Sequence, residues 1–100
     1  MMEKTEKQKM LAGELYSYED PELIAENKQA YRILRKYNLT TEEEQDLRYE
    51  IITELFGQVG KKVNIVPPFY CDYGKNIYVG ENLFINFGCV ILDCNTCSYW

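Results

Sequence analysis

The sequence predicts an α+β protein in which a helical N-terminal part is followed by the first coil or coils of a β-helical solenoid. Three observations support this prediction. The first 60 residues carry helix caps and amphipathic stripes, the composition changes after Gly60, and residues 71–95 follow a six-residue repeat. We therefore divide the chain into a helical cap over residues 1–60 and an incomplete solenoid over residues 61–100.

Length and charge limit the classes of protein that the chain can represent. Its 100 residues, 46% of them hydrophobic, suit one small domain or part of a larger one. A net charge of −5, with lysines interspersed among acids, argues against nucleic-acid and membrane-surface partners. The N-terminus lacks the apolar core of a signal peptide, and no apolar run approaches the roughly 20 residues of a membrane helix. We expect a cytoplasmic protein whose four cysteines are reduced.

Three helices are predicted in the cap. A short one over residues 3–12 ends at Gly13. The second, over residues 21–37, has Asp20 as its N-cap and Pro21 at its first position. Its apolar stripe consists of Leu23, Ile24, Tyr31, Leu34 and Tyr37.

The third predicted helix covers residues 41–56. Thr40 and Glu43 have the spacing of a capping box, and Gly57 is the expected C-cap. The face that should pack on the β part consists of Leu47, Ile51 and Leu55, widened by Ile52 and Phe56. All three helices are interpreted as a packing layer.

The six-residue repeat becomes clear when the chain is written in sixes from Tyr73. Apolar residues recur at the first and fifth places, and Gly or Asn often takes the second place, which suits a corner. The residues predicted to point inward are Ile77, Val79, Leu83, Ile85, Cys89 and Ile91. Such a hexapeptide period is typical of β-helical solenoids. A β-meander with a hairpin turn over residues 80–82 is the alternative.

The length of one coil follows from the repeat. Three sixes would close a coil of about 18 residues. Cys71 and Cys89 have this separation, so they are predicted to stack as buried thiols. Pro67-Pro68 interrupts the preceding extended stretch, which leaves at best a short strand over residues 61–66. The chain would then hold little more than one coil.

Five segments resemble, in order, those of the maltose and galactoside O-acetyltransferases: KMLAGELY, DPEL, ITELFGQVG, PPFYCDYGKNIYVGEN and NFGCVILD. The resemblance covers roughly residues 3–93 and identifies the chain as the N-terminal portion of a family member. It implies a left-handed parallel β-helix behind the helical cap. It also implies a homotrimer with active sites between subunits, which transfers an acetyl group from acetyl-CoA to a sugar hydroxyl.

The resemblance also implies three residues of the sugar site. They are Asp72, Asn86 and Asp93, whose side chains would hydrogen-bond to sugar hydroxyls. Each of them also suits a turn or a coil corner, and this structural reading stays open. An acid that contacts the acceptor in some members has no counterpart here, because Ser17 and Tyr18 occupy that region.

The chemistry departs from the family because the chain contains no histidine. The family's catalytic base is a histidine some twenty residues beyond the VILD match, and the later coils carry most of the acetyl-CoA surface. A sugar hydroxyl needs such a base, and Asp93 with an ordinary carboxyl pKa of about 3.9 would be a weak one. We therefore predict no catalytic or cofactor-binding residue and a fragment that is inactive alone. The alternative is a non-catalytic module that pairs with a full-length homologue.

The C-terminal cysteines invite a metal or redox interpretation. Cys94 and Cys97 have the spacing of half a structural zinc site, but nothing in the sequence completes it. A thioredoxin-like motif would need a βαβ setting, which is absent. Cys97 instead fits the first place of another six, after which SYW does not continue the family pattern. We predict no metal site.

Overall fold

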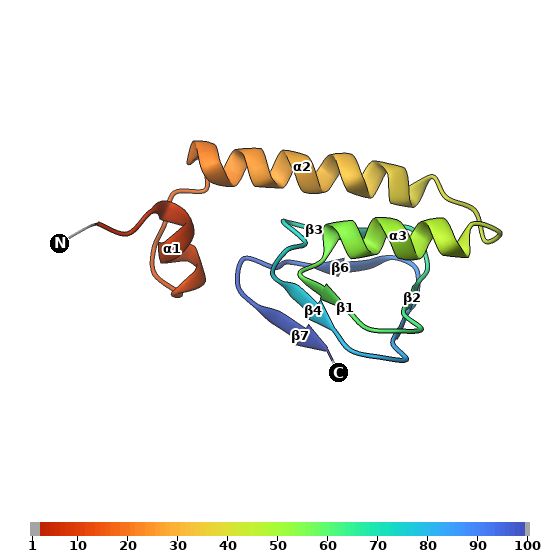
Figure 1. Cartoon of the computed structure of the whole chain (residues 1–100). Coiled ribbons are helices and arrows are strands. Elements are labelled where there is room, and N and C mark those ends of the chain that lie inside the picture. The colour runs from red at the N-terminus through yellow and green to blue at the C-terminus, as the bar shows by residue number, and fades with distance from the viewer. Residues whose placement is uncertain (1–2, 100) are drawn as a thin grey trace.

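The computed structural model describes residues 3–99, in which two longer helices lie over a stack of short strands and a short N-terminal helix lies to one side of it (Figure 1). The helices are α1 (Glu6–Leu11), α2 (Pro21–Asn38) and α3 (Gln45–Leu55). The strands are β1 (Gln58–Val59), β2 (Asn64–Ile65), β3 (Phe69–Cys71), β4 (Ile77–Val79), β5 (Phe84–Ile85), β6 (Cys89–Ile91) and β7 (Cys97–Tyr99). Within this described part, no helix is long and apolar enough to cross a membrane.

The strands form three small parallel sheets, each on its own side of the coil stack. Their orders are β1-β4-β7, β2-β5 and β3-β6, so each strand pairs with its counterpart in the next coil. In the described strands, β4 and β5 are not paired with each other, and residues 80–82 are a coil corner instead of a hairpin turn. The solenoid prediction is confirmed, and the meander is excluded.

One coil is longer than the hexapeptide count predicted. Gln58 lies opposite Tyr78, so the coil closes after 20 residues, and the expected 18 was wrong. The corner after β3, over residues 72–76, is longer than the corners over residues 60–63 and 66–68. Because β1 already belongs to the first coil, the described chain holds two coils and the first strand of a third. The estimate of little more than one coil was therefore too low.

The longer coil also changes which cysteines stack. Cys89 lies opposite Phe69, while Cys71 lies opposite Ile91, so the predicted Cys71–Cys89 stack was wrong. Cys71 is buried as expected, but Cys89 is only partly buried. After them β7 continues the coil through Tyr99, beyond the point where the pattern was expected to stop, and Trp100 lies outside the described residues.

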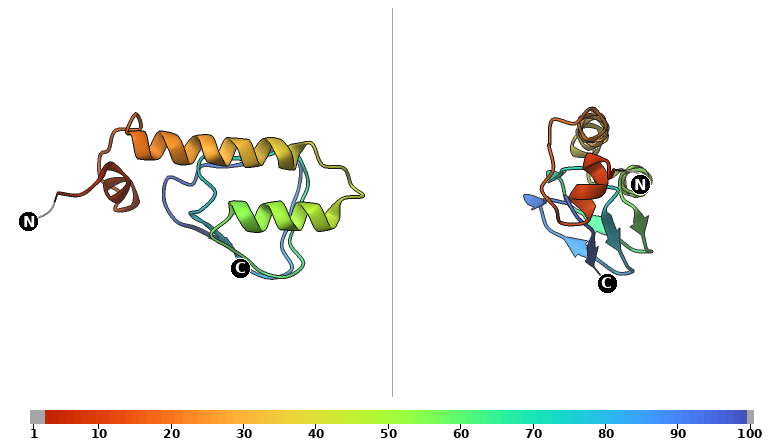
Figure 2. Two further views of the ribbon diagram at one scale, coloured as in Figure 1. Left: turned by 45° about the horizontal axis from the view of Figure 1, so that its top comes forward. Right: turned by 90° about the vertical axis from the view of Figure 1, so that its left-hand side faces the viewer.

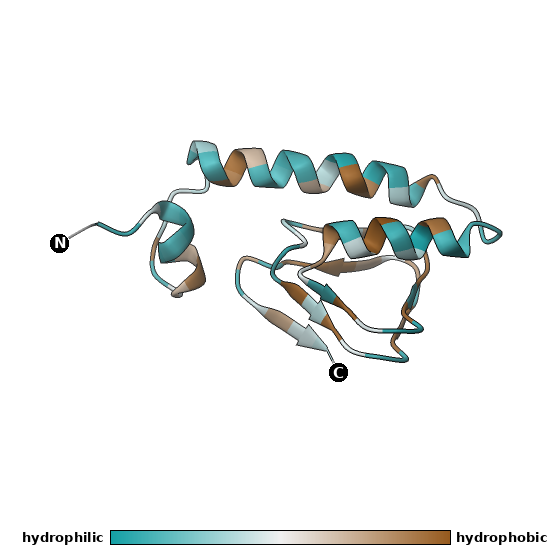
Figure 3. Cartoon of the chain, in the orientation of Figure 1, coloured by the Kyte–Doolittle hydropathy of each residue, from teal (hydrophilic) through white to brown (hydrophobic). Residues whose placement is uncertain are grey.

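The predicted inward positions are confirmed by the core. All six residues either belong to the buried cluster or pack against it, namely Ile77, Val79, Leu83, Ile85, Cys89 and Ile91. Apolar residues of α2, of α3 and of the strands beneath them form this interior (Figure 3).

The helices show where the apolar stripes were read correctly. In α2, Leu23, Leu34 and Tyr37 are buried, while Ile24 and Tyr31 are exposed, contrary to the predicted stripe. Their places in the buried face are taken by two neighbouring apolar residues, Ala30 and Ile33.

In α3 the predicted face is only partly correct. Ile51 and Leu55 are buried, but Leu47 is 40% exposed, and Arg48 is buried in its place. The buried positions 48, 51, 52 and 55 follow the 3.6-residue period more closely than a strict spacing of four, which explains the difference.

The starts of the second and third helices differ in how well they were predicted. A carboxylate oxygen of Asp20 accepts the Glu22 and Leu23 amides at 3.0 and 3.4 Å, which confirms this N-cap. The capping box of Thr40 and Glu43 was wrong, because α3 begins only at Gln45 and no side chain caps it. The Thr40 hydroxyl instead accepts a hydrogen bond from Nε of Arg48 and donates one to the Tyr37 carbonyl.

Gly57 does not cap α3 as predicted. The C-cap is Phe56, whose backbone is extended, and Gly57 has no left-handed conformation. A Cβ atom at Gly57 would lie 2.4 Å from the carbonyl oxygen of Lys75. Glycine is therefore required there by the close approach of the next coil.

The C-terminal end of α2 closes the first coil from outside. The Asn38 side chain accepts the Phe69 amide at 2.9 Å and donates to the Phe69 carbonyl at 3.0 Å, as a neighbouring strand would. The Tyr37 hydroxyl donates to the Ile65 carbonyl. α2 lies along the outside of the coil stack (Figure 2). It thus covers backbone groups of Ile65 and Phe69 that a preceding coil would otherwise pair with.

The burial of α3 gives a stability prediction. Ile51 is 7% exposed and Leu47 is 40% exposed on the same helix. We expect Ile51→Ala to lower the free energy of unfolding by about 2–5 kcal/mol, because it leaves a cavity in the core. Leu47→Ala should change it by about 0.5 kcal/mol or less, as at other surface sites. Urea unfolding of both variants checks this, and equal effects would contradict the observed burial of α3.

Candidate functional site

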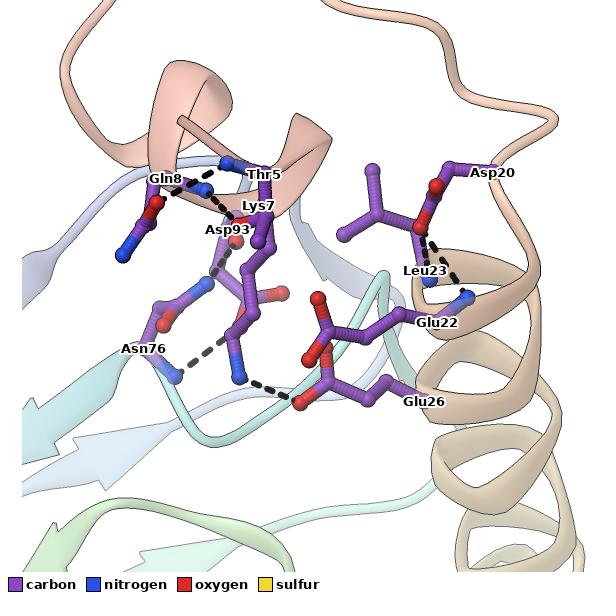
Figure 4. Close-up of polar contacts among 9 residues, drawn as sticks. All are labelled: Thr5, Lys7, Gln8, Asp20, Glu22, Leu23, Glu26, Asn76 and Asp93. Carbon is purple, nitrogen blue, oxygen red and sulfur yellow. Dashed lines mark hydrogen bonds and ion pairs between the residues drawn. The ribbon is translucent and has the colours of Figure 1, made fainter. Parts of the chain in front are cut away.

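A buried carboxylate organises the long corner after β3. Asp93, in the matching corner of the second coil, is fully buried. Its Oδ1 accepts the backbone amides of Asp72 and Tyr73 at 3.0 and 2.9 Å. Its backbone carbonyl accepts the Asn76 side-chain amide at 2.8 Å, and its Oδ2 accepts the Asn76 backbone amide at 3.4 Å (Figure 4). Asp93 thus joins two successive corners.

The electrostatics of this carboxylate follow from its surroundings. Burial raises the pKa of Asp93, while the backbone amides that it accepts act in the opposite direction. A charged group in the interior is tolerated only when it is well hydrogen-bonded, which these amides provide. The Asp93 side chain therefore stabilises the fold through these hydrogen bonds, and no part of it reaches the surface.

Asp72 is held in place from three directions. Its amide is bound by Asp93, and its carbonyl accepts the Asn27 side chain of α2 at 2.8 Å. Its carboxylate oxygen Oδ2 accepts the Cys94 thiol at 3.4 Å. Burial raises the pKa of Cys94, so the thiol stays protonated and can donate. Asp72 itself is half-buried, so its carboxylate can still meet a ligand.

A hollow of about 350 Å³ lies beside Asp72. Its walls come from the α1–α2 connection, from α2 and from the two corners. The lining consists of Tyr16, Tyr18, Leu23, Ile24, Asn27, Tyr31, Asp72, Tyr73 and Cys94. Four tyrosines with a few polar groups are the composition expected of a site for a small ligand that has both apolar and hydroxyl-bearing faces.

The α1–α2 connection is anchored so that its tyrosines reach this hollow. Lys7 of α1 forms an ion pair with Glu26 of α2 (Figure 4), and Met10 is buried. The Ser17 amide donates to the Glu6 carboxylate at 2.8 Å. Tyr16 and Cys94 both line the hollow, and the pKa of Tyr16 is raised by its interaction with Cys94 and by burial.

The three predicted sugar-site residues do not lie together. Asp72 lines the hollow, and Asp93 lies directly behind it as a buried support. Asn86 is exposed at another corner, after β5, where its Oδ1 accepts the amide of Phe87 at 2.8 Å. The geometry therefore brings two of the three together, with different roles for their carboxylates.

Several residues of the hollow were missed by the sequence analysis. Tyr16 and Tyr18 stand in the connection that was set aside because it offers no counterpart to the family's acceptor-contacting acid, and Asn27 lies on a helix that was read only for its apolar stripe. Cys94 was weighed only as a metal or redox group. A tyrosine-rich segment before a strong helix start was the one available signal. Among residues 3–99, no cluster of three or more His, Cys, Asp or Glu residues could hold a metal.

Comparison with known proteins agrees with this architecture. A family model described as the maltose acetyltransferase hexapeptide capping motif matches residues 9–60. The crystal structure of a maltose O-acetyltransferase from Clostridium difficile 630 superimposes with a TM-score of 0.93 at 41% identity, over 96% of this chain and 52% of that one. The fold is therefore that of the N-terminal half of a hexapeptide-repeat acetyltransferase.

Two further relatives support the assignment. Nodulation protein L of Rhizobium meliloti (strain 1021) is 45% identical over 92% of this chain and 50% of its own length. An acetyltransferase from Vibrio cholerae O1 biovar eltor, whose structure contains acetyl coenzyme A, gives a TM-score of 0.82 at 36% identity, over 96% of this chain and 51% of that one. The chain belongs to the maltose/galactoside O-acetyltransferase family. It spans about half the length of these relatives.

The buried carboxylate gives a pH-dependent prediction. Asp93→Asn should lower the free energy of unfolding at neutral pH by about 1–3 kcal/mol, because the NH₂ that replaces Oδ2 cannot accept the backbone amide of Asn76. Since the pKa of Asp93 is raised, the folded state binds its proton more tightly than the unfolded state. Wild type should therefore gain stability over the variant as the pH falls from about 7 to about 4. Urea unfolding across this range measures the difference.

Asp72→Asn makes the same change of charge in the matching corner of the preceding coil and serves as the control. The difference in unfolding free energy between wild type and Asp93→Asn should widen as the pH falls. It should widen more than the difference between wild type and Asp72→Asn. A difference that narrows toward acid would show that the pKa of Asp93 is lowered in the folded protein.

Proposed function

We propose that this chain is the acceptor-binding, N-terminal part of an acetyl-CoA-dependent sugar O-acetyltransferase and is inactive alone. The observation that carries the proposal is the fixed Asp72 carboxylate beside a tyrosine-lined hollow. Membership of the family supplies the reaction class. The four cysteines are free thiols, which suits a reducing compartment such as the cytoplasm.

In this proposal the residues of the hollow divide the recognition of the sugar. Asp72 accepts hydrogen bonds from sugar hydroxyls, and Asp93 keeps it in position. Tyrosine rings such as those of Tyr16 and Tyr73 cover the apolar face of the sugar ring. Asn86 lies at another corner and does not line this hollow, so in this proposal it would meet an acceptor bound to a neighbouring copy of the protein, through the side-chain NH₂ that its own turn leaves free.

The hollow fits an acceptor better than it fits acetyl-CoA. Coenzyme A carries phosphates, which proteins bind with Arg, Lys or backbone amides at helix N-termini. The lining of the hollow contains one carboxylate and no Lys or Arg. We therefore assign it to the sugar and propose that the acetyl donor needs surfaces that these two coils do not provide.

Catalysis by this chain alone lacks a base. A positioned general base contributes about 10²- to 10⁴-fold, and histidine has the suitable pKa. The chain has no histidine. Asp93 cannot replace it, because its oxygens already accept backbone amides in the interior. The hydroxyl of a bound sugar would thus remain unactivated.

The second candidate function is a non-catalytic module that pairs with a full-length homologue or with copies of itself. A full-length protein would form a homotrimer in this proposal. Tyr70 and Val90 lie opposite each other on the outer face of the β3-β6 sheet and are 51% and 57% exposed. Beside them Tyr31 and Leu39 line an apolar groove of about 490 Å³. Sedimentation as a monomer at high micromolar concentration would contradict self-pairing.

The direct test is thiol release from acetyl-CoA with maltose, glucose or a galactoside as acceptor. We expect no sugar-dependent release above background by this chain, and sugar binding no tighter than about millimolar. A chain extended through further coils with a histidine should restore turnover. The comparison is informative because both proteins share the same hollow.

Binding can be followed independently through the thiols. Saturating sugar should slow the alkylation of Cys94, which lines the hollow, and leave Cys97 unaffected. Sustained, sugar-dependent turnover by this chain that Asp72→Asn abolishes would contradict the inactive state, since a carboxylate would then supply the base. Equal alkylation of Cys94 with and without sugar would contradict the assignment of the hollow.

A further inference from the structure

A buried cation without an acidic partner lies at the other end of the cap. Arg48 of α3 is 8% exposed. Its Nε donates to the Thr40 hydroxyl at 2.8 Å, and its Nη2 donates to the Thr40 carbonyl at 3.3 Å. No carboxylate of residues 3–99 lies within ion-pair distance of the guanidinium. The charge of Arg48 is therefore balanced only by neutral oxygens.

The free edge of this guanidinium opens into a polar hollow. Nη1 has no hydrogen-bond partner among the described residues, and no buried side-chain nitrogen there lacks one, so Nη1 must be accessible. Arg48 lines an open hollow of about 480 Å³, whose other lining residues come from the α2–α3 connection and from the segment around β2. Asn38, Gln45 and Asn64 line the same space, but the Asn38 amide is already bound to the Phe69 backbone. The donors left for a ligand are Nη1, the Asn64 amide and the second N–H of the Gln45 amide, whose first N–H is donated to the Glu42 carbonyl.

Acidic residues lie around the entrance of this hollow, and their negative charge opposes the binding of an anion. Glu42 lines the hollow, and Glu43 and Asp46 are also exposed. Exposed carboxylates are screened by water and salt, whereas a buried guanidinium is screened much less. The Glu44 carboxylate is occupied by the Thr41 amide. The first turn of α3, which no side chain caps, adds positive partial charge at the same place.

We propose that this hollow binds a small oxyanion, a carboxylate or phosphate group, on Nη1 of Arg48. The ligand would replace the missing carboxylate partner with a charge-assisted hydrogen bond, and the Asn64 or Gln45 amide would donate a second one. The site is separate from the hollow beside Asp72 and shares no lining residue with it.

Thermal unfolding of the full chain tests the proposal, with inorganic phosphate and acetate as probes and chloride at equal ionic strength as the reference. A ligand that binds only the folded state raises Tm saturably. We expect phosphate, acetate or both to raise Tm by several degrees at about ten times the dissociation constant, beyond the effect of chloride. A response to phosphate alone assigns a phosphate group, and a response to acetate assigns a carboxylate.

Two variants decide whether the response belongs to this site. Arg48→Lys keeps the charge but loses the fork and should weaken the apparent affinity at least about tenfold. Asn64→Asp places a carboxylate in the hollow and should abolish the response while leaving the chain folded. Asn95→Asp, an equal change at an exposed corner, should retain it. A response equal to that of chloride, or one that persists in both Arg48→Lys and Asn64→Asp, would overturn the proposal.

Discussion

The hydrogen bonds that the backbone amides of Asp72 and Tyr73 donate to the Asp93 carboxylate are the contacts on which the site depends. They connect residues one coil apart and fix the corner that makes the coil 20 residues long. Within that corner, Gly74 has a positive φ of 83°, and a Cβ there would lie 2.5 Å from the Leu55 side chain. The corner therefore packs directly against α3. Its shape positions Asp72 and ties the solenoid to the cap.

The helical cap completes what a short solenoid lacks at its beginning. A β-helix exposes unpaired backbone groups at its first and last coils, and such edges must be covered. Asn38 of α2 pairs with both backbone groups of Phe69, and Tyr37 reaches Ile65. Burial raises the pKa of Tyr37 to about 12, so this hydroxyl remains a donor. The cap thus stabilises the first coil and, through α1 and its connection, builds one wall of the hollow.

The sequence predicted the features that are local or periodic. The helices and the inward residues follow from caps and from the hexapeptide register, and Asp20 before Pro21 marks a helix start without tertiary information. The coil length could not be counted in the same way, because the extra residues of the corner are held by Asp93 from the next coil. For the same reason Asp93 resembled a surface turn residue, although its partners bury it.

Tertiary contacts also decided the features of the cap that were misread. Thr40 has the spacing of a capping residue, but its hydroxyl is used by Arg48, and the helix starts later. The hollow beside Asp72 joins segments far apart in the sequence, and no single stretch contains its pattern. The resemblance to the family therefore pointed to Asp72 on one wall of the hollow, while the tyrosines of the other wall were missed.

Amide hydrogen exchange of the corner after β3 tests the central role of Asp93 most directly. Residues 72 and 73 lie outside any strand, and loop amides normally exchange rapidly. If the Asp93 carboxylate holds the corner, the amides of Asp72 and Tyr73 should be protected as strongly as the strand amides of β3. Protection should fall for these two amides first in Asp93→Asn. Rapid exchange of both amides in the wild-type chain would contradict the account.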